Sequence, residues 1–391
     1  MAQWLRASVP VQEIILMAVD ELNRAGGVLG RQIEVVAEDP AGDSTQLVAK
    51  ARKLLQQDKV AAVFGCWISS HRKIIRPVFE ALNGLLFYPL QYEGEECSKN
   101  IIYMGATPNQ QALPAVDYLM SSAGGVRRRF YLIGTDDVYS HTTNKVLHRY
   151  LTEVRKLPKT HIVETYTPFN HQAYDQIANT IRRFCLDGDA AIINTIYGAS
   201  NAAFFKALAV EGVTADMCPV MSFSFAESEL RYMNIKPMVG HMAAWNYFMS
   251  LPYSRNFLWL STYQLWCHTH NIPDAQCVTS DLMMHAYIQV KLWAKAVERA
   301  RSTDTASVQR VLAGMSINSP GGKYRVDAYN HHTWKPVYIG KIRPNGQFDA
   351  VWKTKDWIRP QPWSDILHQI RSCDWSEHGK GTYDVVSGNR I

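Results

Sequence analysis

The sequence has no apolar run of the ~20 residues that a membrane-spanning helix requires. Its longest apolar run, residues 60–68, has the length of a buried strand. The segment 1–10 contains one arginine and no apolar stretch, so it does not form a secretory signal peptide. We therefore expect a soluble globular chain, which is cytoplasmic if Met1 is the true start.

The seven cysteines are far apart, and none forms a Cys-x-x-Cys pair. An odd number of cysteines without a spacing pattern argues against a disulfide framework and against a structural zinc site. The pairs His268/His270 and His331/His332 lack the i, i+4 spacing at which two helical histidines bind one metal ion. We therefore predict no metal site and no cofactor.

Motifs for catalysis are also missing. The chain has no Gly-x-Ser-x-Gly nucleophile turn, and the glycines at 26–30 follow a predicted helix, so their amides cannot cradle a phosphate at a helix start. Cys66 follows an apolar strand, but no base or orienting residue stands near it, and we interpret it as a small buried thiol. The chain is therefore predicted not to be an enzyme.

The charge balance is mild for the length of 391 residues. There are 41 basic and 35 acidic residues, a net charge of +6, and no basic run denser than Arg127-Arg128-Arg129. A nucleic-acid-binding surface needs a denser basic patch, so we expect no nucleic-acid partner. Aromatic residues make up 11% of the chain, which is enough for aromatic-lined surfaces as well as a core.

Most of the chain alternates between helical and strand patterns. Apolar residues at helical spacing, such as Ile14, Ala18 and Leu22, alternate with short apolar runs of strand length. Such alternation predicts parallel sheets with helices on both faces. We expect helices at 11–25, 46–57, 71–83, 110–122, 144–154, 174–184, 202–211, 253–269 and 280–301, and strands at 32–38, 60–65, 85–89, 101–105, 129–134, 161–165, 190–195, 220–223 and 243–248, before a strand-rich tail at 322–352.

The alternation occurs in two blocks of similar size. This indicates the α/β class, with two doubly wound parallel-sheet lobes. A doubly wound lobe usually opens with a strand at the centre of its sheet. The first element here is a helix with about ten residues before it. We therefore expect that the opening strand of the first lobe is missing.

Aromatic and hydroxyl residues follow several of the predicted strands. Open parallel sheets bind ligands beyond the carboxyl ends of their strands, so these residues are candidates for one shared crevice. Each of these residues could instead be a helix cap or a core aromatic. However, aromatic and hydroxyl residues follow five predicted strands, and this repetition favours a ligand-binding site. Rings, hydroxyls and amides without an acid–base pair suit a small neutral polar ligand. The candidates are Trp67, Ser69, Ser70, Tyr88, Gln91, Tyr92, Glu93, Asp137, Tyr139, Thr195 and Ser224.

Several strings of the sequence carry a likeness to a known family, namely residues 64–73, 85–94, 108–111, 194–196, 200–205, 221–224, 243–248 and 330–344. They resemble the urea-binding proteins of urea ABC transporters, which are type I periplasmic binding proteins, and more distantly the related amide-sensing regulator. The likeness covers roughly nine tenths of the chain in collinear order. The chain departs from that family at 135–137, 197–199 and 284–285, which are mostly pocket-facing positions, so a related amide could replace urea.

The resemblance implies two lobes, 1–105 plus 247–325 and 106–246 plus 326–391, that are joined by three crossing segments and close on a ligand. Trp67 and Tyr88 would then cover the faces of the ligand, and Trp245 would lie near the hinge. Ser69, Tyr92 and Glu93 would bind from the first lobe, and Tyr139, Thr195 and Ser224 from the second. The ligand would be urea or a short-chain amide, the partners would be ABC permease subunits in the membrane, and the location would be periplasmic.

Two alternatives remain open. The chain could be a cytoplasmic amide or urea sensor that regulates a partner protein, which the missing signal peptide supports. It could also be a degenerate relative, or the product of a truncated reading frame, that folds poorly without its opening strand.

Overall fold

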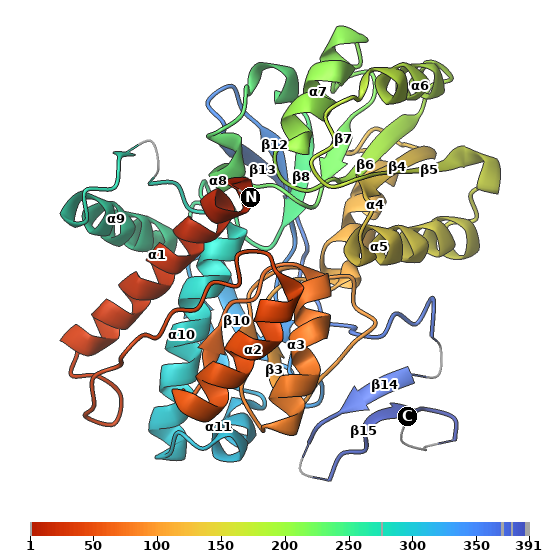
Figure 1. Cartoon of the computed structure of the whole chain (residues 1–391). Coiled ribbons are helices and arrows are strands. Elements are labelled where there is room, and N and C mark those ends of the chain that lie inside the picture. The colour runs from red at the N-terminus through yellow and green to blue at the C-terminus, as the bar shows by residue number, and fades with distance from the viewer. Residues whose placement is uncertain (1, 275–276, 369–370, 377, 388–391) are drawn as a thin grey trace.

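The chain folds around two separate sheets (Figure 1). The computed structural model describes residues 2–274, 277–368, 371–376 and 378–387. The first sheet has three parallel strands in the order β1-β2-β3, and the second has seven in the order β13-β12-β8-β7-β6-β4-β5. None of the helices within these residue ranges is both long and apolar enough to span a bilayer.

The first sheet is short and lies between helices. Its strands are β1 (Val63–Phe64), β2 (Leu86–Tyr88) and β3 (Ile101–Tyr103). On one side the ring of Phe64 lies 5.9 Å from the ring of Trp293 on α10. The surrounding helices are α1 (Ala2–Arg24), α2 (Ser44–Arg52) with a π-helical end at Lys53–Gln57, α3 (Ser69–Ala81), α10 (Asp281–Ala300) and α11 (Thr305–Leu312).

The second sheet combines parallel and antiparallel strands. The parallel strands are β4 (Arg129–Thr135), β5 (Ile162–Thr167), β6 (Ala190–Thr195), β7 (Val220–Ser222) and β8 (Met242–Trp245). Antiparallel β12 (Tyr338–Ile342) and β13 (Phe348–Lys353) extend it beyond β8. The helices α6 (Asp175–Leu186) and α7 (Ser200–Val210) cover one face, and α4 (Ala112–Met120) and α5 (Val138–Arg149) cover the other (Figure 1). Covering on both faces explains why β4 and β6 are almost continuously apolar and buried.

The remaining elements are short or lie outside the two sheets. They are α8 (Glu227–Leu230), α9 (Ser254–Thr269), the antiparallel strands β9 (Ser316–Ser319), β10 (Gly322–Val326) and β11 (Thr333–Trp334), and the hairpin β14 (Arg371–Asp374) and β15 (Gly381–Asp384). Short helical turns occur at Pro108–Gln110, Tyr150–Val154, Lys159–His161 and Lys236–Met238.

The α/β class is confirmed, with one parallel sheet and one that is parallel from β5 to β8 and antiparallel at β12 and β13, but one predicted strand is absent. Residues 32–38 form no strand, and the side chains of Val35 and Val36 are 43% and 41% exposed. A strand needs a hydrogen-bonded neighbour, and within the described residues β1 pairs with β2 alone. The segment therefore lacks a partner strand, and a missing opening strand stays a prediction.

The prediction against disulfides is wrong. Disulfide bonds join Cys97 to Cys373, Cys185 to Cys218 and Cys267 to Cys277, and Cys66 is free. The two partners of the first pair are 276 residues apart in the sequence, so no local spacing could reveal the pairing. An odd count remains compatible with disulfides because one cysteine, the half-buried Cys66, stays out of the pairing.

The connections between the two sheets meet at Asn246, which directly follows β8. Its side-chain Nδ2 donates to the carbonyl oxygens of Gln110, at 3.1 Å, and Pro336, at 2.8 Å. Its backbone N–H donates to Oδ1 of Asp281 at 2.9 Å. Asn246 is fully buried, so these bonds tie three connecting segments together at one point without competition from water.

We predict that Asn246→Ala lowers the free energy of unfolding by about 3 kcal/mol, because two buried carbonyl oxygens lose their donor. Differential scanning calorimetry would measure this. Gln176→Ala, at an exposed amide on α6, is the control and should change stability by less than about 0.5 kcal/mol. Equal effects of the two substitutions would contradict the role of Asn246.

Candidate functional site

A small cavity lies where segments from the two blocks meet. Its volume is about 60 Å³. The first block contributes residues that follow β1 and β2, and the second contributes residues that follow β5, β6 and β7. The cavity is lined by Trp67, Ile68, Ser69, Tyr88, Leu90, Gln91, Phe169, Asn170, Tyr197, Gly198, Ala199, Ser224, Glu229 and Leu282.

The turn between β1 and α3 brings Trp67 and Ser69 to the cavity. Gly65 and Cys66 both have left-handed backbone angles, with φ of 140° and 66°. This reverses the chain sharply, so that α3 begins at Ser69, beside the cavity. The first amides of a helix have no acceptor within that helix, so the N–H groups at the start of α3 can donate to a ligand.

Three hydroxyl groups of the cavity each donate a hydrogen bond to another protein group. Ser69 Oγ donates to Glu93 Oε2 at 2.5 Å, and Tyr88 Oη donates to the carbonyl oxygen of Trp67 at 2.8 Å. Ser224 Oγ donates to the carbonyl oxygen of Ile196 at 2.5 Å. A hydroxyl has one proton and two lone pairs, so these three oxygens can only accept further hydrogen bonds.

Gln91 and Glu229 add two more acceptors. Gln91 donates from Nε2 to the carbonyl oxygen of Phe223 at 3.0 Å, which links the two blocks, while its buried Oε1 accepts no hydrogen bond from the described chain. Glu229 accepts from the backbone N–H of Ala226 at 2.8 Å. Burial raises the pKa of Glu229, although the bond from Ala226 opposes the shift.

A buried ion-pair network supports Ser69 from behind. Arg72 is fully buried on α3 and donates to Glu93 at 3.0 Å, to Glu96 at 2.8 Å and to Ser69 Oγ at 3.2 Å. The guanidinium carbon lies 4.9 Å from the ring of Tyr88. Burial alone would raise the pKa of Glu96, but Arg72 and the nearby lysine and arginine charges outweigh it and lower that pKa to about 2.

Five of the twelve predicted site residues line the cavity, and seven do not. Those that line it are Trp67, Ser69, Tyr88, Gln91 and Ser224. Glu93 stands directly behind Ser69, and the buried Tyr92 donates from Oη to the carbonyl oxygen of Glu96 at 3.0 Å. Ser70 follows Ser69 on α3 but does not line the cavity.

The remaining predicted residues bond within the second block. Asp137 precedes α5 and accepts from Tyr197 Oη at 3.4 Å, and the ring of Tyr139 stacks 5.8 Å from that of Tyr197. Thr195 is fully buried and donates to the carbonyl oxygen of Ile133 at 3.2 Å. Trp245 donates from Nε1 to the carbonyl oxygen of Phe225 at 2.9 Å and packs in the core.

Nine of the fourteen lining residues were not among the predicted site residues, and the aromatic or polar ones among them are Phe169, Asn170, Tyr197 and Glu229. The rule of strand ends could have found Tyr197, which stands two residues after the last residue of β6. Phe169 and Asn170 also follow a strand end, that of β5. Glu229 lies on the four-residue helix α8, which no periodic pattern indicates.

The thiol of Cys66 is not activated as a nucleophile. Burial raises the pKa of the Cys66 thiol to about 12, so this sulfur is protonated at neutral pH and is a poor nucleophile. Across the residue ranges that the structure describes, no three His, Cys, Asp or Glu side chains are grouped to hold a metal ion.

Comparison with known protein families matches nearly the whole chain. A family model described as "Periplasmic binding protein domain" matches residues 6–369. The solute-binding protein of an ABC transporter from Rhodopseudomonas palustris BisB5, in complex with 3,4-dihydroxybenzoic acid, has a TM-score of 0.74 at 16% identity, over 91% of this chain and 94% of that chain. A branched-chain amino acid ABC transporter ligand-binding protein from Burkholderia xenovorans LB400 has a TM-score of 0.73 at 16% identity, over 88% and 90%. At such identities these structures show the shared fold.

Curated relatives match in shorter stretches. The Leu/Ile/Val-binding protein homolog 7 of Brucella melitensis is 36% identical over 80 residues, 20% of each chain. A protein named limonene hydroxylase from Geobacillus stearothermophilus is 30% identical over 132 residues, 33% of this chain and 23% of that protein. The chain thus matches less than a third of the length of these relatives.

We predict that the charge of Glu96 stabilises the fold above about pH 4.5 and that this contribution is lost as the pH falls toward 2, because the folded-state pKa lies below the ordinary 4.5. Glu96→Gln should therefore lower the free energy of unfolding by about 3 kcal/mol at pH 7, and by progressively less below pH 4.5. Calorimetry across this pH range would measure the difference, with the exposed Glu153→Gln as the control. A difference that does not change with pH would contradict the assignment.

Proposed function

Because this chain belongs to the periplasmic binding protein domain family, we propose that it is the substrate-binding component of an ABC transporter and binds urea or a short-chain amide between two lobes. The lobes would be residues 1–105 plus 247–325 and residues 106–246 plus 326–391. Solved structures with this fold include ABC transporter solute-binding proteins, which supports the transport role and a small-molecule ligand.

The observation that carries the ligand class is the acceptor character of the cavity wall. The hydroxyl groups of Ser69, Tyr88 and Ser224 each donate a hydrogen bond to a protein acceptor, and the buried Gln91 Oε1 accepts no bond from the described chain. A ligand rich in N–H groups would satisfy these oxygens, whereas leaving a buried acceptor unpaired costs about 1–3 kcal/mol. Urea and primary amides carry such N–H groups, and their carbonyl could accept from the first amides of α3.

Charge and size favour the same class. The described lining residues include Glu229 but no Lys or Arg, so a carboxylate ligand would meet a negative wall without a cationic partner. The cavity of about 60 Å³ is far below the ~300–1,000 Å³ of sites for drug-sized ligands. The 3,4-dihydroxybenzoic acid named for one similar structure is therefore less suited to this cavity than a planar amide, which Trp67 and Tyr88 would cover.

The disulfides favour a transport component over a cytoplasmic amide sensor. Six of the seven cysteines form three disulfide bonds. Such bonds persist in oxidising compartments such as the periplasm and are rare in the cytosol. We propose that the protein acts in the periplasm and delivers its ligand to permease subunits in the membrane, without performing chemistry on it.

Isothermal titration calorimetry with the purified full chain would test the ligand class. Urea, acetamide and formamide should release or absorb heat at a one-to-one ratio, and guanidinium tests whether Glu229 instead selects a cation. Leucine and 4-hydroxybenzoate, which carry carboxylates, should bind much more weakly. Binding of a carboxylate without binding of any amide would refute the proposed ligand class.

Two neighbouring serines provide a matched test of the site. We predict that Ser69→Ala weakens amide binding about tenfold, which equals loss of ~1.4 kcal/mol, because Oγ of Ser69 can no longer accept from the ligand. Ser70→Ala, one residue further on the same helix and outside the cavity lining, should change the affinity by less than about twofold. Titration calorimetry of both variants measures the two affinities. A larger loss of affinity in Ser70→Ala would contradict the placement of Ser69 at the ligand.

A further inference from the structure

The chain returns from the second sheet to the first block after β13. Residues 358–368 and 371–374 form a segment that we call the strap. It first pairs with the connection between β11 and β12, where Lys335 and Ile358 form an antiparallel bridge, and Asn109 Nδ2 donates to the carbonyl oxygen of Arg359 at 2.7 Å. The strap ends in β14, which pairs with β15 and lies away from β13 (Figure 1).

The strap lies against the loop that carries Gln91 and Glu93. This loop, residues 89–100 between β2 and β3, is called the ligand loop below. The backbone N–H of Glu95 donates to the carbonyl oxygen of Pro362 at 2.5 Å, and Glu95 Oε1 accepts from the backbone N–H of Ser364 at 3.1 Å. His368 pairs with the other oxygen of the same carboxylate.

Gly94 shows how closely the two segments approach. Its φ is +73°, and a Cβ placed on it would lie 2.9 Å from the carbonyl oxygen of Pro362. Real Cβ atoms do not come so close to a backbone oxygen, and a left-handed backbone already disfavours other residues. The ligand loop and the strap are therefore fitted to each other through their main chains.

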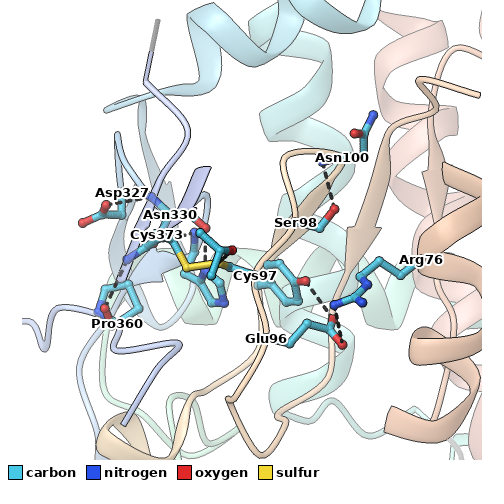
Figure 2. Close-up of a disulfide and its surroundings, with 12 residues drawn as sticks. Arg76, Glu96, Cys97, Ser98, Asn100, Asp327, Asn330, Pro360 and Cys373 are labelled. Carbon is cyan, nitrogen blue, oxygen red and sulfur yellow. Dashed lines mark hydrogen bonds and ion pairs between the residues drawn. A yellow bond between two sulfur atoms is a disulfide. The ribbon is translucent and has the colours of Figure 1, made fainter. Parts of the chain in front are cut away.

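The disulfide between Cys97 and Cys373 closes this contact (Figure 2). It joins β14 to the residue that directly follows Glu96, whose carboxylate binds Arg72. Both sulfur-bearing residues are buried, at 5% and 6% exposure. The covalent bond thus lies beside the ion-pair network that reaches Ser69 through Arg72 and Glu93.

We propose that the strap and its Cys97–Cys373 disulfide are a positioning device that holds the ligand loop in the geometry needed for binding. The proposal rests on the cavity being the ligand site of the proposed function. Without the strap, this twelve-residue loop would be held less firmly between β2 and β3. It would then lose more conformational freedom when a ligand binds, and this ordering weakens affinity. The strap orders Gln91 and Glu93 in advance, so the ligand meets a preformed wall. Cys97 and Cys373 act through the loop and do not touch the ligand.

The test compares two disulfide deletions in the full chain. The double variant Cys97→Ser/Cys373→Ser removes the strap bond, and Cys267→Ser/Cys277→Ser removes the bond at the end of α9, whose cysteines do not line the cavity. We expect the first variant to bind urea and acetamide at least tenfold more weakly, and the second to bind them within about twofold of the wild type. Both double variants should lower the melting temperature. A loss of affinity in the first variant alone would therefore show an effect on positioning that general destabilisation does not explain.

Hydrogen–deuterium exchange gives a readout that does not need the ligand. Amides of the ligand loop should exchange faster in Cys97→Ser/Cys373→Ser and at the wild-type rate in the control variant. Unchanged exchange in the ligand loop would overturn the positioning role, whether or not urea or acetamide binds. Faster exchange in the variant, together with no binding of urea or acetamide to the wild type, would refute only the proposed ligand. Faster exchange with undiminished affinity would overturn the positioning role.

A milder substitution keeps the proposal testable if the double variant does not fold. Glu95→Ala leaves the disulfide in place but removes the side-chain contacts to Ser364 and His368. We expect about threefold weaker binding of urea and acetamide and faster exchange confined to the ligand loop. Wild-type affinity and exchange in Glu95→Ala would count against the strap.

Discussion

The site depends on the pairing of one buried arginine with two buried carboxylates. Arg72 on α3 binds Glu93 and Glu96 of the loop between β2 and β3, and both sides of these pairs are almost fully buried. Transfer of such charges from water is costly, and the pairs offset that cost only when the geometry is satisfied. The helix and the loop are therefore held in one relative position. This pairing also positions Ser69, which lies on the helix, and Gln91, which lies in the loop.

The same pairing determines the hydrogen-bonding character of the cavity. Ser69 donates its hydroxyl hydrogen bond to Glu93, and Arg72 donates to the serine oxygen as well. The serine is left with one lone pair and no proton for a ligand. A charged network behind the cavity thus leaves Ser69 as a hydrogen-bond acceptor toward the cavity.

Particular elements show which sequence signals were sufficient. The strand at β6 and the helix at α10 have strong apolar patterns, and both were predicted within a few residues. The pattern at 32–38 was as strand-like as others, but a strand forms only beside another strand, and the described chain provides no neighbour there. Thr195 and Trp245 were placed by strand-end and family reasoning, yet the side chain of each turns into the sheet or the core, where it bonds a carbonyl oxygen. A sequence lists residues at strand ends, but the pleat decides which of them face the crevice.

The sequence by itself determined the alternation of helices and parallel strands, the two-block organisation and the set of aromatic and hydroxyl residues from which the cavity is drawn. These properties depend on local apolar periodicity and on residue type, both of which can be read along the chain. Only the tertiary structure decided the pairing of Cys97 with Cys373, the tie at Asn246 and the direction in which each hydroxyl donates. Each of these joins segments that are distant along the chain, and their contacts arise only after the sheets have brought those segments together.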